Sequence, residues 1–245
     1  MNNSPGITQL DFLTLRNSFA GYGRIKIIFE VMEEIAMGNN ELTQGKMMQL
    51  LDWSYEKAMN GFPGTPDAYE LAQSYLRKHS SVQKSIDALI RTQNTKAATS
   101  GFLTGLGGLI TLPVAIPANI SSVIYVQMRM VAAIAVMGGY DLKDDQVRTL
   151  VYVSLAGNSA VDILKQTGVN ISKKVAVSAI KKIPGTVITK INQKVGFRLL
   201  TKFGEKGVIN LVKVVPVAGG VVGGVVDLGA TRIVGKAAKK IFIYE

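Results

Sequence analysis

The most informative stretch of the chain is residues 97–128, AATSGFLTGLGGLITLPVAIPANISSVIYVQM, which contains no charged side chain. An uncharged run of this length raises the question of a transmembrane helix. Glycines loosen its first half, and Pro113 and Pro117 interrupt its middle, so a single clean span is not expected. We expect instead two helical arms, the second running over 117–137 and ending at the glycine pair that follows it.

The two arms, residues 97–137, form either a buried core hairpin or a hairpin that dips into a membrane, and the sequence leaves both open. Burial inside the protein is the usual state of a long apolar helix in a chain of this size. The second arm also carries polar side chains that suit a lipid-facing span poorly, namely Asn119, Ser121, Ser122, Gln127 and Arg129.

Apolar residues recur at helical spacing through most of the remaining chain, whereas the alternation typical of strands is short wherever it occurs. A helix with Ile28, Val31, Met32 and Ile35 on one face is expected to end at residues 38–40. Another is expected over 46–60 with Gly61 as a left-handed stop. Further helices are expected after Thr65 as an N-cap, and after a capping box of Ser80 and Gln83 that turns Val82, Ile86, Leu89 and Ile90 inward.

The sequence therefore predicts an all-α, single-domain helical bundle with the uncharged hairpin at its centre and a glycine-rich helical element at its C-terminal end. We expect the domain over residues 47–245, preceded by an N-terminal helical extension over residues 1–46. In the C-terminal element, small residues four apart let helices approach closely. The expected packing residues are Gly219, Gly220, Gly223 and Gly224.

The net charge of +11 is concentrated in the second half of the 245-residue chain. Residues 1–96 carry ten basic and ten acidic side chains, whereas residues 163–245 carry 15 basic and three acidic ones, a balance of +12. Such asymmetry indicates a polyanionic partner, which is anionic lipid, nucleic acid or an acidic protein. The plainer interpretation is a solvated lysine face that maintains solubility.

The pattern of the basic residues favours a membrane surface. Residues 171–183 form an amphipathic basic helix, and basic residues then recur at every fourth position from Lys190 to Lys206. Like charges at this spacing repel one another by a few tenths of a kcal/mol per pair, whereas an anionic leaflet attracts each basic residue by about 1 kcal/mol. The expected headgroup contacts are Lys173, Lys174, Lys181, Lys182, Lys190, Lys194, Arg198 and Lys202.

Two further features bear on this surface. The basic tail at Lys236, Lys239 and Lys240 is followed by the apolar residues 241–244, which is typical of interfacial segments. Phe197 and Phe203 are the only aromatic residues among the basic ones, and both are expected in the core. Nucleic-acid binding needs exposed aromatic platforms, so a nucleic-acid partner is not expected.

Little in the sequence points to catalysis. There is no cysteine and only one histidine, His79, which is expected to act as a cation or cap at a helix end. No P-loop or nucleophile elbow occurs, and we predict no catalytic residue, metal or cofactor. The alternative is a hydrolase or lipid-modifying enzyme that uses Asp141, Asp144 and Asp162, although Asp144 with Asp145 also fits a helix start.

Several blocks of the chain, spread over residues 50–243, resemble the bacterial EcsC family, which is associated with ABC-type exporters. The resemblance implies a largely helical protein and supplies no catalytic residues. The blocks are WSYEKAMNGFPG from Trp53, SGFLTGLGGLITLPVAIP from Ser100, GGYDLKDDQVR from Gly138, KKIPG from Lys181, FRLLTKFGEKG from Phe197 and VVPVAGGVVGGVVD from Val214.

We therefore expect a non-enzymatic protein that associates peripherally with anionic phospholipid membrane through its basic C-terminal half. The N-terminal residues MNNSPGITQLDF lack the pattern of a secretory signal, so a cytoplasmic location at the inner face of the cytoplasmic membrane is expected. Support of membrane transport or envelope processes, with a membrane transport protein as a further partner, is the associated hypothesis. The alternatives are the carboxylate-dependent enzyme and a non-specific nucleic-acid binder.

Overall fold

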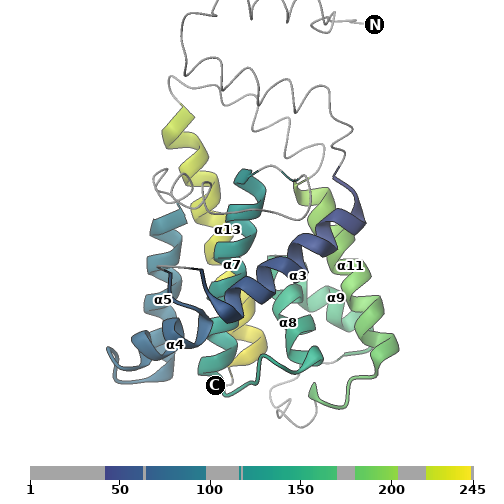
Figure 1. Cartoon of the computed structure of the whole chain (residues 1–245), viewed down its shortest axis with the longest axis horizontal. Helices are drawn as coiled ribbons and strands as arrows, with labels where there is room; N and C mark the ends of the chain where they lie inside the picture. Colours follow the sequence, from purple (N-terminus) through teal and green to yellow (C-terminus); the bar gives the residue numbers. More distant parts are fainter. Residues whose placement is uncertain are drawn as a thin grey trace, which may run out of the picture. The chain divides into compact units, whose positions relative to one another are not determined.

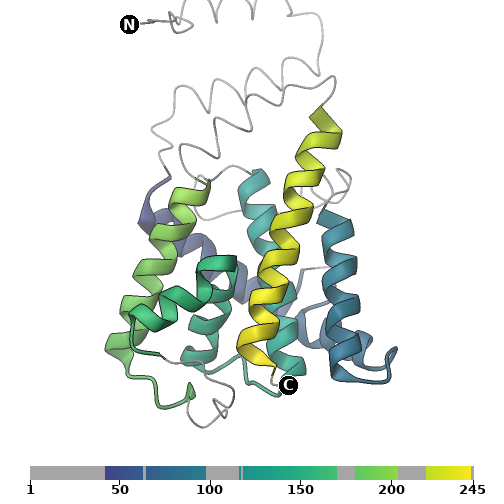
Figure 2. The ribbon, with the colours of Figure 1, turned by 180° about the vertical axis from the view of Figure 1, so that it is seen from behind.

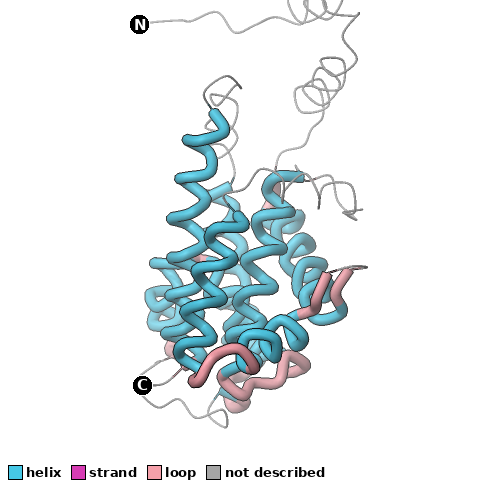
Figure 3. Tube along the Cα trace, turned by 90° about the vertical axis from the view of Figure 1, so that its left-hand side faces the viewer, coloured by secondary structure: helices cyan, strands magenta, loops and turns pink. Residues whose placement is uncertain are grey.

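The computed structural model describes residues 42–62, 65–97, 116, 118–169, 180–203 and 219–243. The chain divides into two units, Met1–Glu41 and Leu42–Glu245, and all of these residues lie in the second. They form eight α-helices and one short 3₁₀ helix. Figure 3 shows helices and loops only, and the sole extended pairing in the described part is an isolated bridge between Phe62 and Thr65. The all-α prediction is thus confirmed.

Helix α7 (Ala118–Met137) is the central element of this unit. Figures 1 and 2 show α3 crossing it on one side and α13 running beside it on the other. Its segment Ile120–Met137 is the one helix of the described part that is long and apolar enough to cross a membrane, and 89% of that segment is buried. The helices that contact α7 are α3 (Gln44–Asn60), α4 (Ala68–Leu76), α5 (Val82–Ala97), α8 (Asp145–Leu155) and α13 (Gly219–Phe242).

The second arm of the predicted hairpin is therefore a core helix in this structure, within one residue of the predicted start. It ends at the predicted glycine pair, where Gly139 has φ +82° and Tyr140 N donates to Ala135 O at 3.1 Å. At Gly138 a side chain would meet the Phe242 carbonyl oxygen at 2.6 Å, so the ends of α7 and α13 pack directly. The first arm of the hairpin and the predicted helix that ends at residues 38–40 lie outside the described residues.

Helix α3 begins and ends at clear local signals. The Thr43 side chain caps it by accepting from Lys46 N at 3.2 Å. The predicted domain boundary between residues 46 and 47 falls in its first turn, and that boundary stays a prediction. The helix stops at Gly61 with φ 74° and ψ 178°, so the stop is glycine-dependent, but the predicted left-handed helical geometry is wrong.

Two predicted helix starts are shifted by one or two residues. Helix α4 is capped by Asp67, which forms a reciprocal capping box with Glu70, while Thr65 bonds back to Phe62. Helix α5 is capped by Ser81, whose hydroxyl accepts from Lys84 N at 3.2 Å. The predicted caps Thr65 and Ser80 are therefore wrong, because the neighbouring side chain reaches the free N–H groups.

The inward face of α5 differs in one residue from the prediction. Ile86, Leu89 and Ile90 are buried as expected, whereas Val82 is 39% exposed. Val82 is the first residue of the helix, at the end of the inward face.

The remaining helices are α9, α11 and α13. A short 3₁₀ turn, Gly157–Ser159, joins α8 to α9 (Ala160–Gln166). Helix α11 (Gly185–Phe203) packs on α3, α8 and α9. Helix α13 runs past α5, where an added side chain at Gly235 would lie 2.7 Å from Ile90. Gly219, Gly220, Gly223 and Gly224 all belong to α13, while their predicted packing lies outside what the structure describes.

Candidate functional site

Four of the predicted headgroup contacts lie on one helix and are exposed. Fourth-residue spacing on α11 sets neighbouring members about 5–6 Å apart along a ridge. Lys202 lies in the last turn, where cations also favour the negative end of the helix dipole. We call the four residues the basic face: Lys190, Lys194, Arg198 and Lys202.

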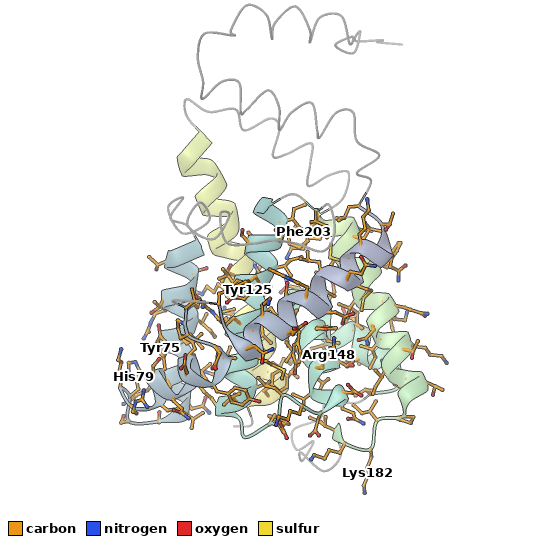
Figure 4. All side chains as sticks on the ribbon, viewed as in Figure 1. Tyr75, His79, Tyr125, Arg148, Lys182 and Phe203 are labelled. Carbon is orange, nitrogen blue, oxygen red and sulfur yellow. The ribbon has the colours of Figure 1, made fainter. Side chains whose placement is uncertain are left out.

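The other four predicted contacts are divided. Lys181 and Lys182 are exposed in the turn before α11, where Lys181 forms an ion pair with Asp144 at 3.1 Å. Figure 4 shows Lys182 and Phe203 toward the two ends of α11, so the basic face occupies the length between them. Lys173 and Lys174 lie outside the described residues, as does Lys206.

The side of α11 next to the basic face packs on the core. Ile191, Val195 and Leu199 are buried in the core. Gly196 is buried as well, and a side chain there would lie 3.0 Å from the sulfur of Met48 on α3. The glycine lets the two helices approach closely without breaking α11, which keeps the cations on one continuous helix.

Phe197 corrects one prediction. It was expected in the core, but it is 60% exposed on the outer side of α11. At about 100° per residue, it lies about 20° from Lys190 and about 60° from Lys194 around the helix axis. Phe203 is half-buried against the core, with the Lys202 ammonium 4.9 Å from its ring centre. Phe197 therefore adds an apolar ring to the surface that carries the basic face.

A surface hollow of about 700 Å³ lies between α9 and α11, against the basic face. Lys190, Lys194 and Arg198 line it from α11 together with Phe197, and Asp162 is the one carboxylate in its lining. The Lys194 ammonium donates to the Gln166 side chain at 3.0 Å, so this cation is held toward α9. Three cations against one acid make the hollow electropositive.

The apolar residues that follow the basic tail do not form the exposed interfacial segment that was expected. Ile241 and Phe242 are 1% exposed, and the Phe242 ring meets Tyr140 edge to face at 5.2 Å. Lys239 pairs with Asp87 of α5 at 2.9 Å. The expected apolar interfacial segment is therefore wrong for these two residues, because they fill the core beneath the end of α7.

Two of the three carboxylates of the enzyme alternative have local partners. Asp141 is exposed and accepts from Lys143 N at 3.0 Å in the loop before α8. Asp144 is the N-cap residue of α8 as predicted, but its side chain makes the ion pair with Lys181 in place of a cap hydrogen bond. Asp162 is exposed on α9. Within the described residues, no cluster of three His, Asp or Glu side chains has the arrangement of a metal site.

Sequence reasoning missed a polar network that joins α3 to α8. Arg148 donates to Asp52 at 2.6 Å and to the Tyr152 hydroxyl at 2.7 Å, and Tyr152 in turn donates to Asp52 at 2.8 Å. Tyr55 donates to the Leu142 carbonyl at 2.7 Å, and its ring lies 5.4 Å from the Arg148 guanidinium. Figure 4 shows Arg148 beside α3.

This network borders a second open hollow of about 700 Å³, lined also by Trp53, Glu56 and Asp145. Burial raises the pKa of Tyr55 and of Tyr152 well above the ordinary value of 10.0, although the nearby Arg148 opposes the shift. Both tyrosines are therefore neutral hydrogen-bonding groups at physiological pH. The one sequence signal was the spacing of Arg148 and Tyr152, four apart on a helix.

The single histidine has a local role at the end of α4. Its ring stacks on Tyr75 with centroids 6.2 Å apart and planes at 21°. Figure 4 labels the two residues. The contact with Tyr75 accounts for the position of this ring, and the expected role as a cation or cap stays a prediction.

These features define an all-α protein with a buried central helix, a basic face on a peripheral helix and structural carboxylates. The sequence model of the EcsC protein family matches residues 30–244, and the chain belongs to the EcsC protein family. Comparisons with curated proteins and with solved structures gave no match.

Proposed function

We propose that this protein binds peripherally to anionic membrane at the inner face of the cytoplasmic membrane, through the basic face of α11 and without catalysing a reaction. The observation that carries the proposal is the exposure of Lys190, Lys194, Arg198 and Lys202 along one helix. Within the described residues, none of Lys190, Lys194 and Arg198 pairs with a carboxylate. Their charge is thus available to a partner.

The magnitudes favour a membrane over bulk water as the environment of this face. Neighbouring like charges cost a few tenths of a kcal/mol per pair in solution. An anionic leaflet contributes about 1 kcal/mol of binding free energy for each basic residue near it. Four cations therefore supply roughly 4 kcal/mol, or about a thousandfold in affinity, which is a reversible peripheral interaction.

The exposed ring of Phe197 supports a lipid partner further. Interfacial binding grows with buried apolar area as well as with attraction to anionic lipid, and this ring adds apolar area among the basic side chains. A nucleic-acid partner would need several exposed aromatic rings to stack bases, and Phe197 is the one large apolar side chain exposed on the described part of α11. Support of a membrane transport protein is a further part of the proposal and would follow from docking at the same surface.

Vesicle flotation of the full chain tests the proposal. We would compare neutral vesicles with vesicles containing anionic lipid, at low and at physiological salt. The wild-type protein is expected to float with anionic vesicles and to dissociate as salt rises, because the interaction is electrostatic. The test variant replaces the basic face with glutamate: Lys190→Glu, Lys194→Glu, Arg198→Glu and Lys202→Glu.

A matched control carries the same change in charge elsewhere on the surface. It replaces three exposed lysines and one exposed arginine that lie off α11: Lys78→Glu, Lys84→Glu, Arg91→Glu and Lys143→Glu. Loss of binding in the test variant with retention in the control supports docking through α11. Equal binding of the two variants, or failure of the wild type to bind anionic vesicles, overturns the proposal. Displacement from vesicles by short DNA at equal charge would favour the nucleic-acid alternative.

A further inference from the structure

We propose that the hollow between α9 and α11 is a headgroup site for a lipid that carries a phosphate monoester, with Phe197 beside it as the anchor among the acyl chains. This inference rests on the proposed membrane docking and names the lipid that the docking surface selects. It arises from a feature beyond the charge of α11, namely an open hollow of about 700 Å³ against the basic face.

Three cations line the hollow from one helix. Lys190, Lys194 and Arg198 line the same hollow from successive turns of α11. The hydrogen bond from Lys194 to Gln166 uses one of the three ammonium donors and holds the side chain toward α9. Arg198 adds a planar guanidinium, which binds phosphate oxygens through two parallel hydrogen bonds.

The charge of the lining selects the class of headgroup. Asp162 is the carboxylate of the lining, so the three cations leave a balance of +2. A phosphate monoester carries a charge of about −1.5 to −2 at neutral pH, whereas the phosphodiester of an ordinary anionic lipid carries one negative charge. The monoester thus matches the charge of the hollow, and a diester leaves part of it uncompensated.

The exposed ring identifies the source of the phosphate as a lipid. Phe197 lines the hollow and is 60% exposed. A soluble phosphate compound would leave this ring in water, whereas a lipid headgroup in the hollow brings the ring to the level of the acyl chains, where burial of a large apolar side chain is favourable.

The first experiment compares vesicles that contain phosphatidic acid with vesicles that contain phosphatidylglycerol, at fractions adjusted to equal measured surface potential. The wild-type protein is expected to bind the phosphatidic acid vesicles roughly fivefold more tightly, the effect of about 1 kcal/mol. Arg198→Gln is expected to remove this preference. Lys182→Gln is the matched control, because Lys182 is exposed beside α11 but does not line the hollow.

The second experiment separates the lipid from a soluble phosphate compound. Glycerol 3-phosphate is titrated into the protein by calorimetry, and Phe197→Ser is compared with wild type in both assays. Phe197→Ser is expected to weaken vesicle binding severalfold and to leave the titration unchanged. In Phe197→Trp, the emission is expected to be quenched by vesicles with brominated acyl chains, while Trp53, which is 9% exposed, supplies the constant background.

The outcomes separate this inference from the proposed function. Equal affinity for both lipids at equal surface potential overturns the headgroup site and leaves electrostatic docking in place. Tight binding of glycerol 3-phosphate, with no effect of Phe197→Ser on vesicles, overturns the lipid as its source. No binding to either vesicle overturns docking and headgroup site together. A lipid preference that Arg198→Gln removes and Lys182→Gln retains supports the site.

Discussion

Arg148 donates to Asp52 at 2.6 Å and so connects two helices whose paired residues are 96 positions apart in the chain. Tyr152 completes a triangle, since it accepts from Arg148 and donates to Asp52. Each of the three side chains thus forms a hydrogen bond with each of the other two. Since α3 also packs on α7, the triangle fixes α8 and the central helix in one arrangement.

The triangle is expected to stabilise the fold through coupled hydrogen bonds. Asp52 is 53% exposed and Arg148 37% exposed, so solvent screens their charges and the ion pair alone contributes little. Tyr152→Phe removes two hydrogen bonds in a buried setting and is expected to lower the free energy of unfolding by about 1–2 kcal/mol. Urea unfolding followed by circular dichroism measures this loss.

A double-mutant cycle tests whether the three groups act together. Asp52→Ala and Tyr152→Phe are expected to show a coupling energy of about 0.5 kcal/mol or more, because they share one network. Asp162→Ala, an exposed aspartate without an ion pair in the described part, is the control and should add independently to Tyr152→Phe. Additive effects of the first pair would contradict the network.

The raised pKa of two tyrosines predicts a loss of stability at alkaline pH. The folded protein holds the hydroxyl protons of Tyr55 and Tyr152 above pH 10.0, where tyrosines of the unfolded chain release theirs. The unfolded state then binds fewer protons, so the free energy of unfolding falls as pH rises. The expected slope is about 1.4 kcal/mol per pH unit for each tyrosine.

Urea unfolding at several pH values between neutral and alkaline measures that slope. The variant Tyr55→Phe with Tyr152→Phe is less stable at neutral pH but should lose stability more slowly above pH 10, because it lacks the two groups. If the slopes of variant and wild type are the same, burial of the tyrosines is not the source of the alkaline sensitivity.

Two glycines of α13 are expected to respond to alanine with opposite signs. A side chain at Gly235 would meet Ile90 of α5 at 2.7 Å, so Gly235→Ala should force the helices apart and cost about 1–3 kcal/mol. Gly229 is exposed, and nothing lies within 4 Å of the added atom. Gly229→Ala should therefore stabilise the helix by about 0.5–1 kcal/mol. Thermal unfolding of both variants, which share one helix, measures the difference.

Periodicity predicted the helices well because it depends on neighbours within one turn. The expected arm over 117–137 and the observed helix Ala118–Met137 agree within one residue, since Pro117 and the glycine pair act locally. The caps were less accurate: either Ser80 or Ser81 can reach a free N–H, and only the path of the preceding loop selects Ser81. Local sequence therefore locates a helix more reliably than it locates its first residue.

The site was predictable in its charge and not in its contacts. The spacing of Lys190, Lys194 and Arg198 needs only a helix to form one face. The exposure of Phe197 depends on which side of α11 packs against α3, and Gly196 occupies that side. The bond between Asp52 and Arg148 depends on how helices pack, and no local pattern contains that information.

The buried Arg129 is expected to be dispensable for stability. It is 4% exposed on α7, yet among the described residues it pairs with no carboxylate; its guanidinium donates to Pro66 O at 3.2 Å and lies 5.4 Å from the centre of the Tyr125 ring. Removing a buried charge that has no opposite charge is often neutral or stabilising when an apolar side chain of similar size replaces it. Arg129→Met should therefore leave the free energy of unfolding unchanged or raise it by about 1 kcal/mol or more, whereas Arg148→Met should lower it. Urea unfolding of the two variants decides the point, and a large loss in Arg129→Met would mean that the charge is compensated.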